Sequence, residues 1–158
     1  MGGVSTYFKD INYSIEQWTA TSCRAINHSK HNKRCDIFYN KFIEVVVPSL
    51  NKNDIVIISS QWIGTLEDIG NNEFIKRIKN LFNVLKLSGT NVVVVGNTPG
   101  FYKSPFNLMV QHNLNPNKIN NVSLISRDFR RVNQFLSKEA ESYGYIFINP
   151  AETFCDKK

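Results

Sequence analysis

The sequence lacks the long apolar segments that mark membrane proteins and secretory leaders. It has no run of about 18 apolar residues, which a transmembrane helix requires, and no charged-then-apolar leader typical of a signal peptide. It also lacks the composition of a disordered chain, because 42% of its residues are hydrophobic and only 20% are charged. We therefore expect one globular domain that spans residues 1–158.

Cysteine is scarce, with three residues in the chain, so at least one has no partner within it. Cys23 and Cys35 flank a polar segment, and a disulfide between them would stabilise the fold by roughly 3 kcal/mol. The same stretch contains His28 and His31, which makes a zinc site an alternative, although the spacing is not a standard zinc pattern. A disulfide is the favoured interpretation, followed by free thiols and then a metal. Cys155 has no evident partner.

Motifs of several enzyme classes are missing. The sequence contains no Gly-x-Ser-x-Gly elbow, no Walker loop and no dinucleotide-binding glycine pattern. His28, His31 and His112 have no recognisable catalytic motif beside them, so none is assigned to a triad. Residues 96–100 (GNTPG) could hold a phosphate with backbone N–H groups, but a simple Gly/Pro turn is the preferred interpretation. We expect no cofactor and no metal.

The net charge of +6 permits binding to polyanions without demonstrating it. The basic runs at residues 28–34 and 126–131 lack the aromatic interleaving and the modules of known nucleic-acid-binding proteins. A solvated surface explains them better, and no nucleic-acid partner is expected. A non-catalytic basic α/β module that binds an acidic glycan or nucleic acid is kept as the alternative function.

Hydrophobic periodicity predicts alternating helices and strands. Continuous apolar, β-branched runs predict buried strands at 55–59, 92–95 and 145–148, and a half-polar run predicts a further strand at 14–21. Apolar stripes predict helices at 35–47, ended by Pro48, at 73–87 and from Ser126 to Tyr143. Val4, Tyr7, Phe8 and Ile11 have the spacing of another helix, without a capping residue ahead of it. Residues 60–72 and 96–121 are expected to be loops.

This alternation predicts an α/β fold, a three-layer α/β/α sandwich around a parallel sheet. Ligands of such folds bind beyond the carboxyl ends of the strands. Four segments are expected at that rim: 21–23, 59–62, 96–99 and 149–151.

The order of these segments resembles one family closely. The resemblance rests on residues 17–23 (QWTATSC), Cys35 at the start of a helix, 54–62 (DIVIISSQW), 92–99 (VVVVGNTP) and 146–155 (IFINPAETFC). Together these segments resemble the SGNH-hydrolase-type domain fused to the membrane acyltransferases that O-acetylate bacterial surface polysaccharides such as lipopolysaccharide. The resemblance extends over nearly the whole chain.

The resemblance implies acyl transfer through a Ser acyl-enzyme, with a polysaccharide acceptor, an acyl donor and a place at the periplasmic or outer side of the membrane. The family carries its nucleophile in a Gly-Asp-Ser-His motif and its acid and base in an Asp-x-x-His motif, and neither motif occurs in these 158 residues. We therefore expect a partial SGNH-like domain, inactive alone, whose missing N- and C-terminal parts would complete the site.

The family's sheet order is 2-1-3-4-5, so the resemblance also implies that the first, central strand is missing. Strands 14–21 and 55–59 would then lack their shared neighbour, leaving apolar faces exposed and stability marginal. A further cysteine of the family would pair with Cys155. The expected oxyanion-side residues are Ser22, Gln61, Trp62 and Asn97, although residues 60–63 (SQWI) depart from the Gly-x-Asn-Asp pattern of simple esterases.

Overall fold

A computed structural model describes residues 14–19, 23–26, 33–98, 110 and 129–154 of the chain. In order, its elements are α2 (Lys33–Lys41), the π-helical segment η1 (Phe42–Val46), α3 (Val47–Ser49), β1 (Ile55–Ser59), α4 (Trp62–Ile69), α5 (Asn71–Ser88), β2 (Asn91–Val95), α8 (Phe129–Tyr143), β3 (Ile146–Ile148) and α9 (Pro150–Phe154). None of the described helices is long and apolar enough to cross a membrane.

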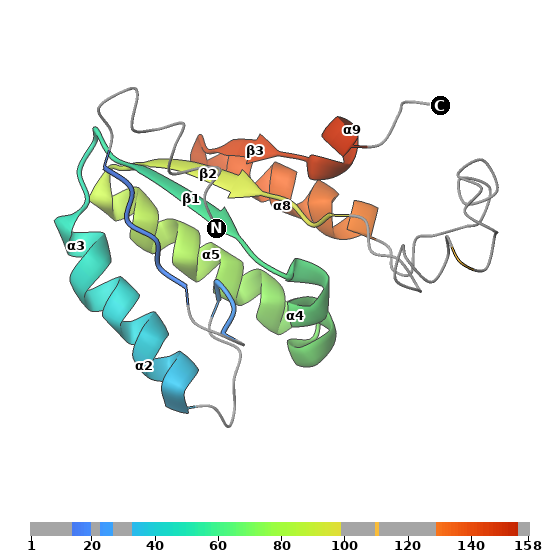
Figure 1. Ribbon diagram of the computed structural model, residues 1–158, viewed down its shortest axis with the longest axis horizontal. Helices are drawn as coiled ribbons and strands as arrows, with labels where there is room; N and C mark the ends of the chain where they lie inside the picture. The colour runs from blue at the N-terminus through green and yellow to red at the C-terminus, as the bar shows by residue number, and fades with distance from the viewer. Residues whose placement is uncertain (1–13, 20–22, 27–32, 99–109, 111–128, 155–158) are drawn as a thin grey trace.

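The three described strands form a parallel sheet in the order β1-β2-β3 (Figure 1). Ile58 of β1 pairs with Val94 of β2, and Val94 in turn pairs with Phe147 of β3. β-Branched residues dominate these strands because their stiff side chains pack well on a pleated surface. The three apolar strands and the parallel α/β arrangement predicted from the sequence are confirmed.

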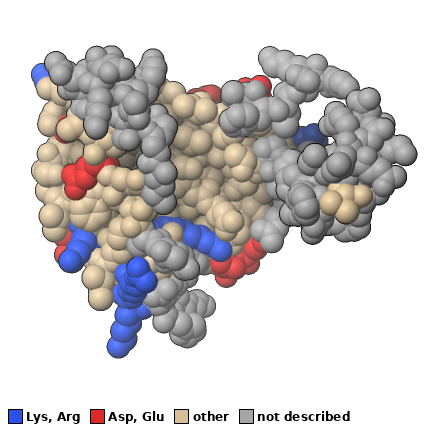
Figure 2. Space-filling model, in the orientation of Figure 1, with Lys and Arg blue, Asp and Glu red and all other residues tan. Residues whose placement is uncertain are grey.

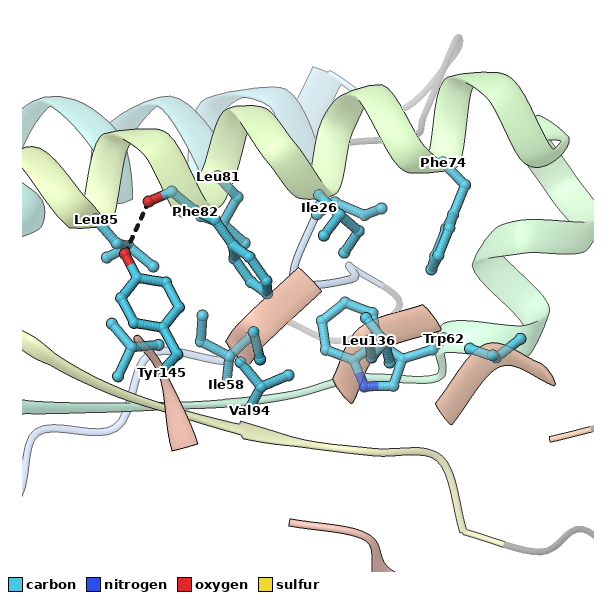
Figure 3. Close-up of a cluster of buried hydrophobic side chains, with 14 of the residues drawn as sticks. Ile26, Ile58, Trp62, Phe74, Leu81, Phe82, Leu85, Val94, Leu136 and Tyr145 are labelled. Atoms are coloured by element: carbon cyan, nitrogen blue, oxygen red, sulfur yellow. Dashed lines mark hydrogen bonds between the residues drawn. The ribbon is translucent and has the colours of Figure 1, made fainter. Parts of the chain in front are cut away.

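The helices gather on one side of this sheet, as Figure 1 shows for α5 and α8. Figure 3 shows the core between α5 and the strands, where Ile58 and Val94 point toward the helix. Phe74 of α5 contacts Phe135 of α8, with ring centroids 5.8 Å apart. The buried set joins these helices to α3 and α4 in one cluster, so α3, α4, α5 and α8 share a single core.

No described helix covers the opposite side of the sheet. Because successive side chains of a strand point to opposite faces, Ile55 and Ile57 of β1 point away from the core, as do Ile146 and Ile148 of β3. These four side chains are between 45% and 62% exposed. These side chains form an exposed apolar face on this side of the described sheet.

Tyr145 links the start of β3 to α5. Its hydroxyl donates a hydrogen bond of 2.8 Å to the carbonyl oxygen of Phe82, shown by the dashed line in Figure 3. The Tyr145 ring lies edge-on to that of Phe82, with centroids 5.3 Å apart. Burial, with a smaller contribution from neighbouring Tyr143, raises the pKa of Tyr145 to about 12. The phenol of Tyr145 therefore stays protonated and neutral in its buried position.

Two predictions from the sequence are wrong. Residues 60–72 are not a loop, because α4 begins at Trp62 and buries Trp62, Ile63, Gly64 and Thr65. Residues 14–19 of the predicted strand 14–21 have no regular secondary structure and are exposed. A strand needs a hydrogen-bonded neighbour, and instead Trp18 bonds to Glu16 through Nε1 (2.8 Å) and lies near Phe38. Residues 20–21 lie outside the described residues.

The predicted helix 35–47 also differs from expectation around Pro48. The helical backbone continues past it to Ser49, and residues 42–46 widen into a π-helical turn in which the Val47 N–H donates to the Phe42 carbonyl oxygen. Proline has no N–H and its ring crowds the carbonyl one turn earlier, a conflict that a wider turn relieves. The extra residue rotates the apolar face, so Val45 is exposed while Val47 joins the core.

Candidate functional site

The parallel sheet brings three of the expected rim segments to one edge. β1, β2 and β3 end in register at Ser59, Val95 and Ile148, so residues 60–61, 96–98 and 149–151 lie next to one another. Residues 23–26 reach the same edge, because the Ala25 N–H donates to Ser60 Oγ at 3.2 Å. This end of the sheet is where an α/β fold offers a ligand site.

Asn133 of α8 is the centre of the polar contacts at this edge. Its Oδ1 accepts from the Asn97 N–H at 2.7 Å, and its Nδ2 donates to the Asn97 carbonyl oxygen at 3.0 Å. The same Nδ2 donates to Asn149 Oδ1 at 2.9 Å. One amide that is only 3% exposed thus fixes the ends of β2 and β3 relative to α8.

Gly96 makes this close approach possible. A Cβ at Gly96 would lie 2.8 Å from Cζ of Phe147 and 2.9 Å from Oδ1 of Asn133, closer than atoms of these types pack. The Gly96 N–H donates to the Ile148 carbonyl oxygen at 2.9 Å. Since the Asn97 N–H is also bonded, both leading N–H groups of the 96–100 segment are occupied inside the chain. These two bonds favour the turn over the phosphate-binding interpretation.

The four expected oxyanion-side residues have different surroundings. The indole of Trp62 is fully buried and donates from Nε1 to the Val95 carbonyl oxygen at 2.8 Å. The Asn97 side chain accepts from the Ile63 N–H (3.2 Å) and donates to the Thr98 carbonyl oxygen (2.9 Å). The side chain of Gln61 is exposed where α4 begins. Ser22 lies outside the described residues.

These contacts show how the expected donor groups are used. Trp62 uses its one indole N–H, and Asn97 uses one of its two amide hydrogens, to hold the rim together, so both residues position the site. Within the described residues, the Gln61 amide and the Thr98 hydroxyl are donors on rim residues that are exposed to solvent. An exposed amide at the end of a strand is suited to hydrogen-bond a carbonyl oxygen or a hydroxyl of a ligand.

Arg24 packs over the first turns of α4, and sequence reasoning gave it no role. Its Nη2 lies 2.9 Å from the Asp68 carboxylate, and the missing side chain of Gly64 leaves room for the guanidinium. Its Nη1 is buried without a hydrogen-bond partner in the structure. Arg24 thereby ties residues 23–26 to α4 at the edge of the rim.

Asn133 was also missed, and Asn149 was expected only as part of the rim segment 149–151. Asn133 is a polar residue between Val132 and Leu136 on the apolar stripe of its helix. A polar side chain on a buried helix face needs hydrogen-bond partners, and this was the available signal. Asn149 directly follows a strand and donates from Nδ2 to Glu152 Oε1 at 3.0 Å, a contact that periodicity does not reveal.

Cys23 and Cys35 are joined by a disulfide, with Cα atoms 5.2 Å apart. This is the pairing favoured from the sequence. It leaves neither sulfur as a thiolate for the alternative metal site, and the described residues contain no cluster of metal-ligand side chains. His28, His31 and Cys155 lie outside the described residues. The disulfide anchors the start of α2 to residues 23–26, which lead into the rim.

The chemistry that the described rim offers is limited to hydrogen bonding. Each histidine of the sequence lies outside the described residues, so no nucleophile–base pair is found in the described part. The rim presents amides, the Ser60 hydroxyl and backbone groups. Such a surface can orient a polar ligand.

Comparison with known proteins gives one match. A family model described as the SGNH domain (fused to AT3 domains) matches residues 1–158. No curated protein and no solved structure matches the chain significantly. The match agrees with the order of motifs in the sequence and with the parallel α/β fold, and it confirms the resemblance. The chain belongs to the family of SGNH domains that are fused to AT3 domains.

Proposed function

We propose that this chain is the SGNH part of an enzyme that O-acetylates a bacterial surface polysaccharide. Its family membership supports this, because the family's SGNH domains are fused to AT3 acyltransferase domains. In the complete enzyme, a serine would carry the acyl group as an ester before a sugar hydroxyl accepts it. We place the domain at the outer side of the membrane, with an acyl donor and a polysaccharide as substrates.

We further propose that the 158 residues form one partial domain that does not catalyse this reaction alone. The observation that carries this proposal is the absence of both the Gly-Asp-Ser-His and the Asp-x-x-His motif from the sequence. An acyl-enzyme needs a nucleophile with a base beside it. The rim would contribute binding, with Gln61 and the backbone near Ser22 facing the acyl oxygen and Asn133 holding the rim in place.

The alternative of a basic glycan-binding module gains no support from the face shown in Figure 2. Figure 2 shows Lys and Arg on one face as separate groups with Asp and Glu among them, and most of the described surface on that face is uncharged. Binding to a polyanion favours a continuous basic patch or stripe.

The proposed function is tested in the source organism by deleting, in frame, the coding region for residues 1–158. We expect ester-linked acetate on the surface polysaccharide, measured after mild alkaline release, to fall to background. As a matched pair, N133A should lower acetylation because it loosens the rim, whereas Q134A, at the exposed neighbouring position of α8, should not. Unchanged acetate after the deletion would overturn the proposal.

The proposed inactivity of the isolated chain is tested with p-nitrophenyl acetate. We expect the folded chain to release p-nitrophenol no faster than the same chain unfolded in urea, after correction for the effect of urea on the ester. Q61A should have the same background rate, because no acyl-enzyme forms. Saturable turnover by the folded chain would show that it contains a complete catalytic site.

A further inference from the structure

We propose that Arg24 is a positioning residue that fixes the start of helix α4, and with it Gln61, at the rim. Arg24 belongs to residues 23–26, which we call the strap. Its importance for acyl transfer rests on the proposed function, in which Gln61 faces the acyl oxygen. Its effect on the position of Gln61 does not, because that effect follows from contacts within the chain.

The strap is anchored at both ends. Cys23 is joined by the disulfide to Cys35, a buried residue near the start of α2. At the other end, Ile26 is fully buried, and Figure 3 shows it among the core side chains beneath α5. A covalent bond and a closely packed side chain both resist displacement. The two residues between these anchors therefore have a fixed support.

The middle of the strap contacts residues on either side of Gln61. The Ala25 N–H donates to Oγ of Ser60, the residue before Gln61, at 3.2 Å. The guanidinium of Arg24 packs over Gly64, which follows Gln61 in the first turn of α4. Two consecutive residues of the strap thus hold both ends of the short segment that carries Gln61.

Gly64 and Asp68 form the seat of the guanidinium on α4. A Cβ at Gly64 would lie 3.2 Å from Arg24 Nη2 and 3.3 Å from Nη1, which is tighter than ordinary packing. Glycine within a helix lowers its stability relative to alanine, and the guanidinium explains why a glycine is needed at this position. One turn further along α4, the Asp68 carboxylate lies 2.9 Å from Nη2.

The energetics favour a positioning role over a stabilising one. The Arg24 side chain is 20% exposed, and within the described part of the chain its Nη1 is buried without a hydrogen-bond partner. A buried donor without a partner destabilises the folded state, and apolar side chains often replace a buried ion pair without loss of stability. An apolar side chain cannot reproduce the directional contact of a planar guanidinium with its carboxylate.

Amide hydrogen exchange of the 158-residue chain, followed by NMR, tests this role. The reporters are the N–H groups of Trp62, Ile63 and Thr65, each of which donates a hydrogen bond within the chain. R24M should raise their exchange rates roughly tenfold relative to those of α8, because the start of α4 opens more often. The urea midpoint should stay within about 0.3 M of the unaltered chain. As the matched control, R77M breaks an arginine–carboxylate pair within α5 and should leave these rates unchanged.

Two results of the exchange experiment would overturn the proposal. Unchanged rates at the start of α4 in R24M would show that this helix is positioned without the guanidinium. Rates raised evenly over the whole chain, together with a lower urea midpoint, would show that Arg24 only stabilises the fold.

G64A checks the seat independently of R24M. In the unaltered chain, the added methyl group displaces the guanidinium, so the exchange rates at the start of α4 should rise. In an R24A background that space is open, and G64A should instead lower these rates, because alanine favours a helix over glycine. The same effect of G64A in both backgrounds would contradict the contact.

Acetylation in the source organism separates this proposal from the proposed function. R24M should lower ester-linked acetate on the polysaccharide severalfold, and R77M should not. If deletion of residues 1–158 abolishes acetylation but R24M leaves it unchanged, the position of Gln61 does not matter for the reaction and the proposal fails. If the deletion itself leaves acetate unchanged, the proposed function fails, and the exchange rates alone decide whether Arg24 positions α4.

Discussion

The arrangement of the rim depends most on the hydrogen bonds of the Asn133 side-chain amide. Replacing Asn133 is therefore the sharpest test of how the rim is held together. N133A deletes three hydrogen bonds of 2.7, 3.0 and 2.9 Å. It leaves the N–H and the carbonyl of Asn97, and Oδ1 of Asn149, without these partners. Each buried polar group left unsatisfied costs about 1–3 kcal/mol. Because Asn97 is only half-buried, water compensates in part, and we expect a loss of about 2–4 kcal/mol.

That loss is large for a domain of this size, whose free energy of unfolding is roughly 5–15 kcal/mol. Urea unfolding followed by tryptophan fluorescence measures it, because Trp62 is buried beside the rim. The midpoint should fall by roughly 1–2 M urea. Q134A is the matched control on the exposed side of α8 and should change the free energy of unfolding by less than about 0.5 kcal/mol.

The variant N133D separates the loss of hydrogen bonds from the loss of volume. It has nearly the same shape as asparagine and keeps the acceptor for the Asn97 N–H, but the ionised side chain has no donor for the Asn97 carbonyl or for Asn149. We expect it to be destabilised nearly as much as N133A at neutral pH. If N133A and N133D both unfold within about 0.5 kcal/mol of Q134A, the reasoning about the rim is refuted.

Three further predictions concern other contacts. Reducing the Cys23–Cys35 disulfide should lower the free energy of unfolding by about 3 kcal/mol; an unchanged urea midpoint in dithiothreitol would contradict this. Because the folded pKa of Tyr145 is raised from 10.0 to about 12, its contribution is complete below pH 10 and is lost as the pH rises through 12, by about 2–3 kcal/mol. Y145F should lack this decline in pH-dependent urea melts, and an identical decline in Y145F would assign it to other groups. G96A should destabilise by about 1–3 kcal/mol, because its Cβ would lie 2.8 Å from Phe147; a melting temperature equal to that of the unaltered chain would show that the neighbours move freely.

Hydrophobic periodicity predicted the elements whose apolar residues form a continuous run or a stripe in the sequence. The strands at 55–59, 91–95 and 146–148 are continuous β-branched runs, and the stripe of α5 is buried as expected. The predicted strand 14–21 failed in its described part, because pairing depends on a neighbour far along the chain. Helix α4 was missed because Gly64 interrupts its pattern; that glycine is explained by the packing of Arg24 against it.

The sequence predicted the location of the candidate site more accurately than the roles of its residues. The parallel sheet places the expected segments at one edge, which follows from chain direction alone. The roles of Trp62 and Asn97 depend on which carbonyl each donor reaches, Val95 and Thr98, and this is set by three-dimensional contact. Asn133 comes from a helix 36 residues beyond Asn97, a distance over which single-sequence patterns carry no pairing information.

The central claim is that this chain holds a folded rim without a catalytic nucleophile. The most direct test incubates the folded full chain with a fluorophosphonate, which modifies serines activated by a neighbouring base, and measures the intact mass. The account predicts an unmodified mass under conditions in which a serine hydrolase control is fully labelled. A stoichiometric adduct on a serine of the folded chain, absent after unfolding, would contradict it.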